Sequence, residues 1–366
     1  MKSRFLIIIL LCFWSCTQIR EATDAILKPS AREIYARDFD KESLDFRNWE
    51  EAYENAKSDS LSVSEPFVMA GKFHPDNNFV YNYNLLINKG KRVFVEVLLQ
   101  DSARVFIEVF EQSDFNLKAQ SEIDQSVISV AIENTGLYKV IIQPEIGASS
   151  DFVLKIYTQP VYGFPVAGAG SKNIQSFWGA NRNGGSRTHE GVDIFAPRGT
   201  PVIAATDGRI GFTGERGLGG KQVWLRDGNS SNSLYYAHLD SIMTNSGQKV
   251  EKGDTLGTVG NTGNAIHTAP HLHFGIYSGY GAIDPLLFIK EKPIPETVSE
   301  FNSQKAKVVR KGSELRTGPS VQNTQIGSLN ENDTVFLLGK SNSWFQVSVS
   351  DSLNGFIHQS LLKITN

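Results

Sequence analysis

The sequence predicts a mostly β protein, on three observations. Between residues 65 and 157, short runs of β-branched and aromatic residues alternate with turn signals. Further along the chain, four histidines lie in short apolar contexts of the kind that strands provide. Three more short apolar runs follow residue 304. With 366 residues, the chain is long enough for two or three domains, each with a buried core.

The N-terminus is expected to direct export. A basic head at residues 1–4 precedes an apolar run at 5–14, which is too short to span a bilayer and is typical of a signal peptide. Ser15 and Cys16 then resemble a lipoprotein cleavage site, which predicts a signal peptide of residues 1–16 and a lipid on Cys16. We therefore expect a cell-envelope protein anchored to a membrane through that lipid, with simple secretion as the alternative.

Cysteine usage and charge exclude several kinds of site. Cys12 and Cys16 are the only cysteines, so neither a disulfide nor a thiolate metal site is available to the rest of the chain. The net charge is −3 and no basic stripe is visible, so nucleic acid is not an expected partner. Any metal site must therefore use nitrogen and oxygen ligands.

Residues 17–64 are expected to form a tether and a short helix. The part up to about residue 40 is polar and mixed, which favours a tether. The stretch 44–57 places apolar side chains at helical spacing, which packing against a core explains better than a membrane surface. These side chains are Phe46, Trp49, Ala52, Tyr53 and Ala56.

Residues 65–158 are expected to form a β-sandwich accessory domain. Its candidate strands recur at short intervals and are separated by Gly-, Asn- and Asp-containing turns. The runs are 93–97, 105–109, 127–132, 137–142 and 152–157. The segment resembles the jelly-roll-like accessory modules of secreted bacterial enzymes, although no motif is specific. Sugar binding and a scaffold that orients or covers an active groove both remain open.

The histidines of the next segment have the spacing of a metal site. Side chains i and i+2 share one face of a strand, so His271 and His273 project together. The same rule places His189 and Asp193 on one face if that segment is extended, and His238 follows an aromatic pair. Imidazole and carboxylate are preferred zinc ligands, and three protein ligands with one open position describe a catalytic site.

Residues 161–290 resemble the lysostaphin-like zinc endopeptidases of bacterial cell walls. The motifs that carry the resemblance occur in the order of that family, and they cover about a third of the chain. They are His-Glu-Gly-Val-Asp (189–193) with Ile-Phe-Ala-Pro-Arg-Gly-Thr-Pro-Val (194–202), Ala-Thr-Asp-Gly (205–208), Tyr-Ala-His-Leu (236–239), Lys-Gly-Asp (252–254), Gly-Asn-Thr-Gly (260–263), Pro-His-Leu-His-Phe (270–274) and Asp-Pro (284–285).

The resemblance implies a role for each of the five residues and a fold for the segment. It makes His189, Asp193 and His273 the ligands of one Zn²⁺ per chain, and His238 and His271 an unligated catalytic pair. The implied fold is a small, mostly antiparallel β domain with the metal in a groove. One histidine can accept a proton from the attacking water and the other can stabilise the developing oxyanion, but the sequence does not say which does which.

Three neighbouring features are expected to be peripheral. Glu190 follows the first ligand directly, so an extended chain points it to the opposite face, at the surface or behind the ligands. His267 lies in the loop before the His-x-His strand and is expected to be solvated. The glycine-rich stretch 214–220 lacks the ending of a phosphate-binding loop and is expected to form a rim of the groove.

The C-terminal part is expected to be a second module. Residues 291–304 contain proline and polar residues and are expected to be a linker. In residues 305–366, the signature Leu-Arg-Thr-Gly-Pro-Ser (315–320) and the apolar runs after it resemble bacterial SH3-like domains, which implies a small barrel that holds an enzyme on peptidoglycan peptides. Core packing is the expected role of Trp344 and Phe356.

The resulting hypothesis is a zinc-dependent endopeptidase that hydrolyses cross-links or stem peptides of bacterial peptidoglycan. The alternative is a catalytically silent cell-wall-binding regulator of a separate amidase. Relatives of that kind typically have broken ligand sets, whereas this set is whole. A third candidate is a secreted peptidase that acts on other proteins.

Overall fold

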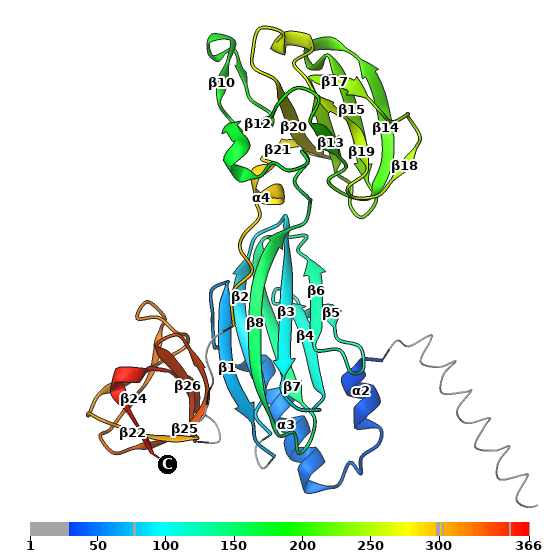
Figure 1. The fold of residues 1–366 in the computed structure, drawn as a ribbon. Helices are drawn as coiled ribbons and strands as arrows, with labels where there is room; N and C mark the ends of the chain where they lie inside the picture. Colours follow the sequence, from blue (N-terminus) through cyan, green and yellow to red (C-terminus); the bar gives the residue numbers. More distant parts are fainter. Residues whose placement is uncertain (1–28, 76–77, 298–300, 302–303, 351–352, 366) are drawn as a thin grey trace, which may run out of the picture.

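The computed structural model describes residues 29–75, 78–297, 301, 304–350 and 353–365. The expected signal peptide and Cys16 lie outside these residues. The described chain is mostly antiparallel β-sheet, as predicted, and forms a β-sandwich with a second β body at one end and a small barrel at its side (Figure 1). Within the described ranges, no helix is long and apolar enough to cross a membrane.

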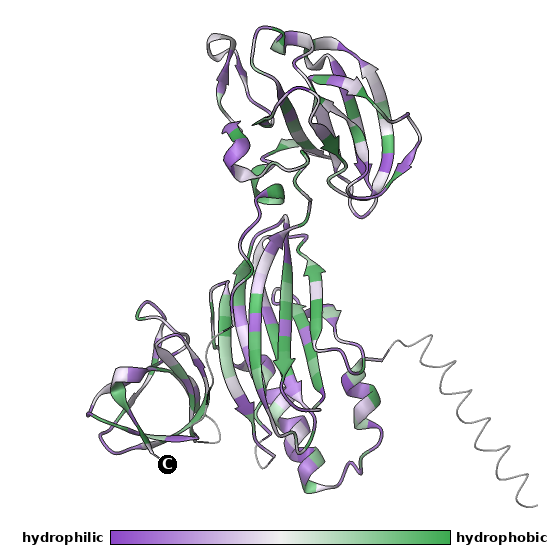
Figure 2. Cartoon of the chain, in the orientation of Figure 1, coloured by the Kyte–Doolittle hydropathy of each residue, from purple (hydrophilic) through white to green (hydrophobic). Residues whose placement is uncertain are grey.

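The sandwich consists of two packed sheets. The strand order is β1-β8-β3-β6 in one sheet and β2-β7-β4-β5 in the other. Their bounds are β1 (Phe67–Phe73), β2 (Tyr81–Ile87), β3 (Lys91–Leu99), β4 (Val105–Glu111), β5 (Asn116–Gln120), β6 (Val127–Ala131), β7 (Gly136–Pro144) and β8 (Ser150–Pro160). All five predicted runs are confirmed as strands, whereas β1, β2 and β5 were not predicted. Hydrophobic and hydrophilic residues alternate along many of these strands, because one face packs on the core (Figure 2).

Two helices cover the β2-β7-β4-β5 sheet of the sandwich. The predicted helix is confirmed as α3 (Leu44–Ser58), which buries Phe46, Trp49, Tyr53 and Ala56. Part of the expected tether is instead helix α2 (Ala31–Ala36), which begins with a capping box between Ser30 and Glu33. Composition could not reveal this helix, because its buried residues, Ala31 and Arg32, contact segments that are distant in the sequence. The Arg32 guanidinium lies 3.7 Å from the centre of the Tyr53 ring and donates to Gln143 Oε1.

The middle body has a curved sheet in the order β18-β14-β15-β16-β20-β12-β9, a three-stranded sheet β13-β19-β17 and the hairpin β10-β11. The bounds are β9 (Ile174–Ser176), β10 (Asn181–Arg182), β11 (Arg187–Thr188), β12 (Val192–Phe195), β13 (Pro201–Ile203), β14 (Gly208–Glu215), β15 (Lys221–Asp227), β16 (Ser233–Ala237), β17 (Leu239–Ile242), β18 (Lys249–Val250), β19 (Thr255–Val259), β20 (His271–Ser278), β21 (Gly281–Ile283) and α4 (Leu286–Ile289). Short 3-10 turns are η1 (Ser171–Asn173), η2 (Asn183–Gly185), η3 (Gly217–Gly219) and η4 (Gly263–Ala265). The core lies between the two sheets, so the other face of the larger sheet is open to form a site.

The C-terminal part is a small barrel. Its strands are β22 (Lys305–Val308), β23 (Ser313–Arg316), β24 (Gln325–Leu329), β25 (Thr334–Ser341), β26 (Trp344–Ser350), β27 (Leu353–His358) and β28 (Leu362–Thr365), with a 3-10 turn η5 (Gln359–Leu361). Phe356 is fully buried and Trp344 is half-buried against the core that the barrel shares with the sandwich. Core packing of both aromatic residues is therefore confirmed.

The barrel and the sandwich share one continuous sheet, which the sequence did not predict. Strand β25 pairs with β1 at Gly339 and Lys340, opposite Gly71 and Ala70. Around this seam, the Tyr81 hydroxyl donates to the Leu338 carbonyl at 3.0 Å, a bond between residues far apart in the sequence. The two cores therefore meet across the seam instead of being separated by solvent.

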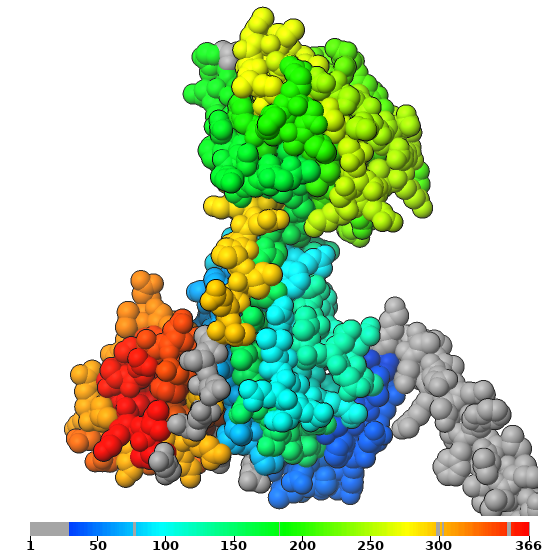
Figure 3. Space-filling view, viewed as in Figure 1, coloured from blue at the N-terminus to red at the C-terminus, as the bar shows by residue number. Residues whose placement is uncertain are grey.

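The described first part of the expected linker, residues 291–297, lies on the sandwich surface. Residues 291–297 have no regular secondary structure but run along β8. The Gln159 amide donates to the Lys292 carbonyl at 2.8 Å, and Lys155 Nζ donates to the Pro295 carbonyl at 3.0 Å. Figure 3 shows this segment, in yellow-orange, lying against the sandwich between the other two parts.

Replacing Gly339 by valine is expected to weaken the seam between barrel and sandwich. A Cβ at this position would lie 2.7 Å from Met69 Sδ and 3.0 Å from the Ala70 carbonyl, so the two strands must separate. Overpacking of this kind lowers the free energy of unfolding by about 1–3 kcal/mol. Limited proteolysis should then cut within 291–304 faster than in the unaltered chain. Thr334→Val, at an exposed position of the same strand, is the matched control; equal cleavage of both variants would contradict a close-packed seam.

Candidate metal centre and active groove

The open face of the larger sheet places the candidate ligands side by side. Strand β12 pairs with β20 so that Asp193 lies opposite His273 and Phe195 lies opposite His271. On the other side of β20, Ala237 of β16 lies opposite His273. The alternating residues of β12 and β20 are buried in the core, which is why the sequence alternates apolar and functional residues here. His189 lies just before β12 and is buried.

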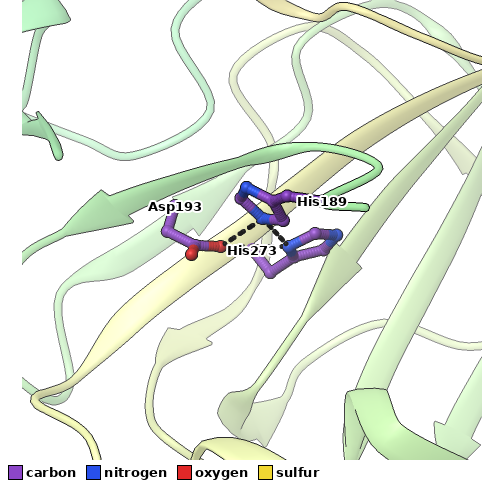
Figure 4. A group of neighbouring side chains, drawn as sticks. All are labelled: His189, Asp193 and His273. Carbon is purple, nitrogen blue, oxygen red and sulfur yellow. Dashed lines mark hydrogen bonds and ion pairs between the residues drawn. The ribbon is translucent and has the colours of Figure 1, made fainter. Parts of the chain in front are cut away.

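Three side chains meet at one point of this face. His189 Nε2, Asp193 Oδ1 and His273 Nδ1 are each 3.0 Å from the other two (Figure 4). Among the described residues, these three side chains form a group that could hold a metal ion. His189 Nδ1 donates to the Phe177 carbonyl at 2.9 Å, which leaves its Nε2 free as an electron-pair donor.

This donor set fits zinc. Two imidazole nitrogens and one carboxylate oxygen are ligands that zinc takes at about 2.0–2.2 Å, and donors 3.0 Å apart can share one such ion. Burial opposes ionisation of Asp193, but its close contacts with His189 and His273 outweigh it and hold the pKa of that carboxyl well below its usual range. Burial also lowers the pKa of His273. Both shifts favour the deprotonated states that metal binding requires.

The second oxygen of Asp193 is held by an arginine that the sequence analysis did not identify. Arg182, on β10, donates to Asp193 Oδ2 at 2.7 Å and to Ser176 Oγ at 2.6 Å. This contact orients the carboxylate so that Oδ1 faces the two histidines. Arg182 lies eleven residues before Asp193 on a separate hairpin, so no local pattern could have revealed the contact.

Replacing Arg182 by alanine is expected to weaken zinc binding. Loss of a partner that orients a ligand typically costs about 10- to 100-fold in metal affinity. Competition with a chromophoric chelator measures that affinity directly. Arg187→Ala, on the same hairpin but outside the Asp193 contact, should keep the original affinity. Unchanged zinc affinity in Arg182→Ala would show that Asp193 needs no support from this side chain.

His238 and His271 face the same point without joining the three donors. The Nδ1 of His271 donates to the Ala269 carbonyl at 2.8 Å, and its Nε2 lies 4.0 Å from Asp193 Oδ1. The Nδ1 of His238 donates to the Thr262 carbonyl at 2.9 Å, and its ring centre lies 5.1 Å from that of His271. Each ring therefore keeps its Nε2 available on the side of the groove.

His238 is neutral at pH 7. Burial, together with the neighbouring His273 and His271, lowers the pKa of His238 to about 4. Its backbone has φ 62°, a left-handed conformation that is uncommon outside glycine. The amide of His238 donates to the Gly219 carbonyl at 2.8 Å, which helps to hold this conformation. Strand alternation alone would place Ala237 and His238 on opposite faces, whereas both line the groove.

The five predicted site residues lie in one groove of about 1030 Å³. Of the peripheral features, Gly217–Gly219 lines the groove as a rim, and His267 is exposed, both as expected. Glu190 is exposed but also lines the groove. Tyr235, which was not predicted from the sequence, also lies at the site, with its ring centre 5.8 Å from that of His273. Its position two residues before Ala237 on β16 was the signal that could have found it.

Comparison with known proteins agrees with this geometry. Residues 187–285 match the profile described as peptidase family M23, and residues 311–363 match that of a bacterial SH3 domain. An L-Ala–D-Glu endopeptidase of Bacillus subtilis is 37% identical over 128 residues, which are 33% of this chain and 39% of that protein. The peptidoglycan DD-endopeptidase ShyC of Vibrio cholerae is 38% identical over 88 residues, 24% of this chain and 20% of that protein.

Among solved structures, the catalytic domain of the antimicrobial peptidase lysostaphin from Staphylococcus simulans is similar to part of this chain. The identity is 35%, the match covers 32% of this chain and 92% of that domain, and the TM-score is 0.29. The chain spans only about a fifth to two fifths of the length of the two curated relatives described above.

Proposed function

The chain contains an M23 peptidase domain and a bacterial SH3 domain, and from this premise we propose that it is a zinc-dependent endopeptidase of bacterial peptidoglycan. The substrate is a cross-link or stem peptide, and one Zn²⁺ is held by His189, Asp193 and His273. The observation that carries the proposal is the meeting of three donor atoms 3.0 Å apart in an open groove. An intact donor set distinguishes this chain from a silent regulator of a separate amidase.

The chain's own residues supply the acid-base chemistry and the orientation of the peptide. Bound zinc supplies Lewis acidity, which lowers the pKa of a water and polarises the scissile carbonyl. His238 is neutral and presents a free Nε2, so it can accept a proton from the attacking water. His271 Nε2 lies 4.0 Å from Asp193 Oδ1, beside the three donors. His271 can therefore stabilise the oxyanion or protonate the leaving amine. The assignment of these two jobs can also be reversed.

The relatives support a peptidoglycan substrate but differ in the bond that their names state. One is named for an L-Ala–D-Glu bond and another as a peptidoglycan DD-endopeptidase. We therefore propose the substrate as the peptide portion of peptidoglycan and leave the bond to experiment. The barrel at 305–366 is proposed to hold the enzyme on that peptide, and the sandwich at 65–158 to position the groove.

The proposed location is the cell envelope, outside the cytoplasm. A peptidoglycan substrate supports it, as do the apolar run at 5–14 and the expected lipidation site Cys16. Lipid on Cys16 would tether the enzyme to a membrane next to its substrate. Secretion without a lipid remains the alternative; mass spectrometry of the N-terminal peptide of the mature protein distinguishes the two.

Digestion of purified sacculi tests the proposed activity. The purified protein should carry one zinc per chain and release soluble muropeptides, whose masses identify the cleaved bond. A silent regulator would contain no stoichiometric zinc and release nothing. A general secreted peptidase would instead cleave casein or glycine-rich peptides and leave sacculi intact.

A further inference from the structure

The groove beside the three donors is rich in positive charge. Its lining includes four arginines but only two carboxylates, Asp193 and Glu190. The whole chain has a net charge of −3, so the positive charge is a local property of the groove. The arginines are Arg182, Arg187, Arg216 and Arg226.

Three of these guanidinium groups have no carboxylate partner among the residues that the structure describes. Arg182 forms an ion pair with Asp193. In the described part of the chain, none of the ion pairs involves Arg187, Arg216 or Arg226. Arg187 lies on the β10-β11 hairpin, Arg216 lies between β14 and η3, and Arg226 lies on β15. Positive charge therefore reaches the groove from strand β15, from the β10-β11 hairpin and from the loop before η3.

An aromatic floor connects the metal site to Arg226. The ring of Tyr235 lies 5.8 Å from that of His273, and the ring of Trp224 lies 4.5 Å from that of Tyr235. Tyr277 completes the cluster, with its ring centre 5.0 Å from that of Trp224. Trp224 and Arg226 are two residues apart on β15, so both side chains project from the same face as the floor.

The fold makes room for Arg226 at the end of this floor. The pairing of β14 with β15 shifts register between Ile210 and Phe212, so Gly211 lies in a bulge. A Cβ on Gly211 would lie 3.2 Å from Arg226 Nε and 3.5 Å from its Cγ. The absence of a side chain at Gly211 therefore lets the stem of Arg226 lie across β14 at the groove.

We propose that the groove selects peptides that carry a free carboxylate some residues away from the scissile bond, at the far end of the aromatic floor, and that Arg226 is the main determinant of this selectivity. A guanidinium group binds a carboxylate through two parallel hydrogen bonds, while Trp224 and Tyr235 cover the apolar part of the peptide. Arg187 and Arg216 add attraction from the rims. An uncharged, glycine-rich peptide would leave these groups without a partner. The inference rests on the proposed function, because it names the chemical class of substrate at the same groove.

Binding of two matched peptides tests this inference independently of turnover. The probes are a synthetic cross-linked stem-peptide dimer with free α-carboxylates and the same dimer with carboxamides in their place. Binding is measured with the full zinc-loaded chain carrying His271→Ala, so that neither probe is consumed. The carboxylate dimer should bind at least about tenfold more tightly. Adding Arg226→Gln should bring the two affinities within about threefold, mainly by weakening the carboxylate dimer.

Lys172→Gln is the matched control, because it removes one positive charge from an exposed position of the same body outside the groove. It should preserve the preference. Equal affinity of the two dimers, no binding of either, or equal weakening of both by Arg226→Gln would overturn the inference. The sacculus assay separates the two proposals. If the protein prefers the carboxylate dimer but leaves sacculi intact, only the peptidase function is rejected. If it digests sacculi but shows no preference between the dimers, only the selectivity is rejected.

Discussion

Asp193→Ala should lose stoichiometric zinc and lower turnover of sacculi by at least about 1000-fold, since zinc catalysis supplies several kcal/mol of transition-state stabilisation. Asp193 contributes the only carboxylate of the three donors and lies within 3.0 Å of both histidine nitrogens. Removing it leaves two neutral ligands and no negative charge to offset the metal. It also leaves the Arg182 guanidinium beside the ion, which adds repulsion.

Zinc per chain, measured by elemental mass spectrometry after dialysis, is the primary measurement for this variant. Asp193→Asn keeps the size of the side chain and should lose zinc as well, which separates loss of a ligand from loss of packing. Asp240→Ala removes a carboxylate from an exposed ion pair with Arg198 in the same body, and should retain both zinc and turnover. One zinc per chain in both Asp193 variants would mean that this residue is not a ligand.

His271→Ala should retain zinc and lose about 10²- to 10⁴-fold in turnover, the usual contribution of a positioned acid or base. Its ring stacks on Phe195, with ring centres 5.0 Å apart, and its Nε2 stops 4.0 Å from Asp193. The three donor atoms contact one another without it, so its removal should leave them in place. Zinc content and sacculus digestion, measured on the same preparation, separate a catalytic role from a ligand role.

The double variant with His238→Ala sharpens this test. If the two histidines act in one catalytic unit, the double variant should be little slower than the slower single variant. Additive losses would indicate separate roles. Turnover that persists in His271→Ala at the original rate would reject its catalytic role, and loss of zinc from this variant would make it a ligand instead.

Strand alternation predicted those parts of the site whose residues lie on one regular strand. His271 and His273 are two residues apart on β20, and the structure places both on the groove face. The five strand runs of the sandwich and the helix at 44–57 were predicted for the same reason, because periodic burial is a local property. The strands β1, β2 and β5 and the helix α2 were missed, because long-range contacts decide their structure.

The sequence did not predict how the barrel and the sandwich are joined. Proline content and polarity favoured a linker at residues 291–304, before the barrel. Pairing of β25 with β1 shows instead a barrel joined to the sandwich through a shared sheet. Backbone hydrogen bonds between strands depend little on side-chain identity, so neither strand carried a signal of this pairing.

By itself, the sequence determined the chemistry of this protein: which imidazoles and carboxylate are present, and the spacing that aligns them along short strands. Only the tertiary structure decided how that chemistry is completed. Arg182 reaches Asp193 from another hairpin, and the left-handed backbone of His238 turns its ring into the groove. Arg226 lies at the end of an aromatic floor because a bulge at Gly211 makes room for it. Each of these features arises from contacts between distant segments, which local periodicity does not encode.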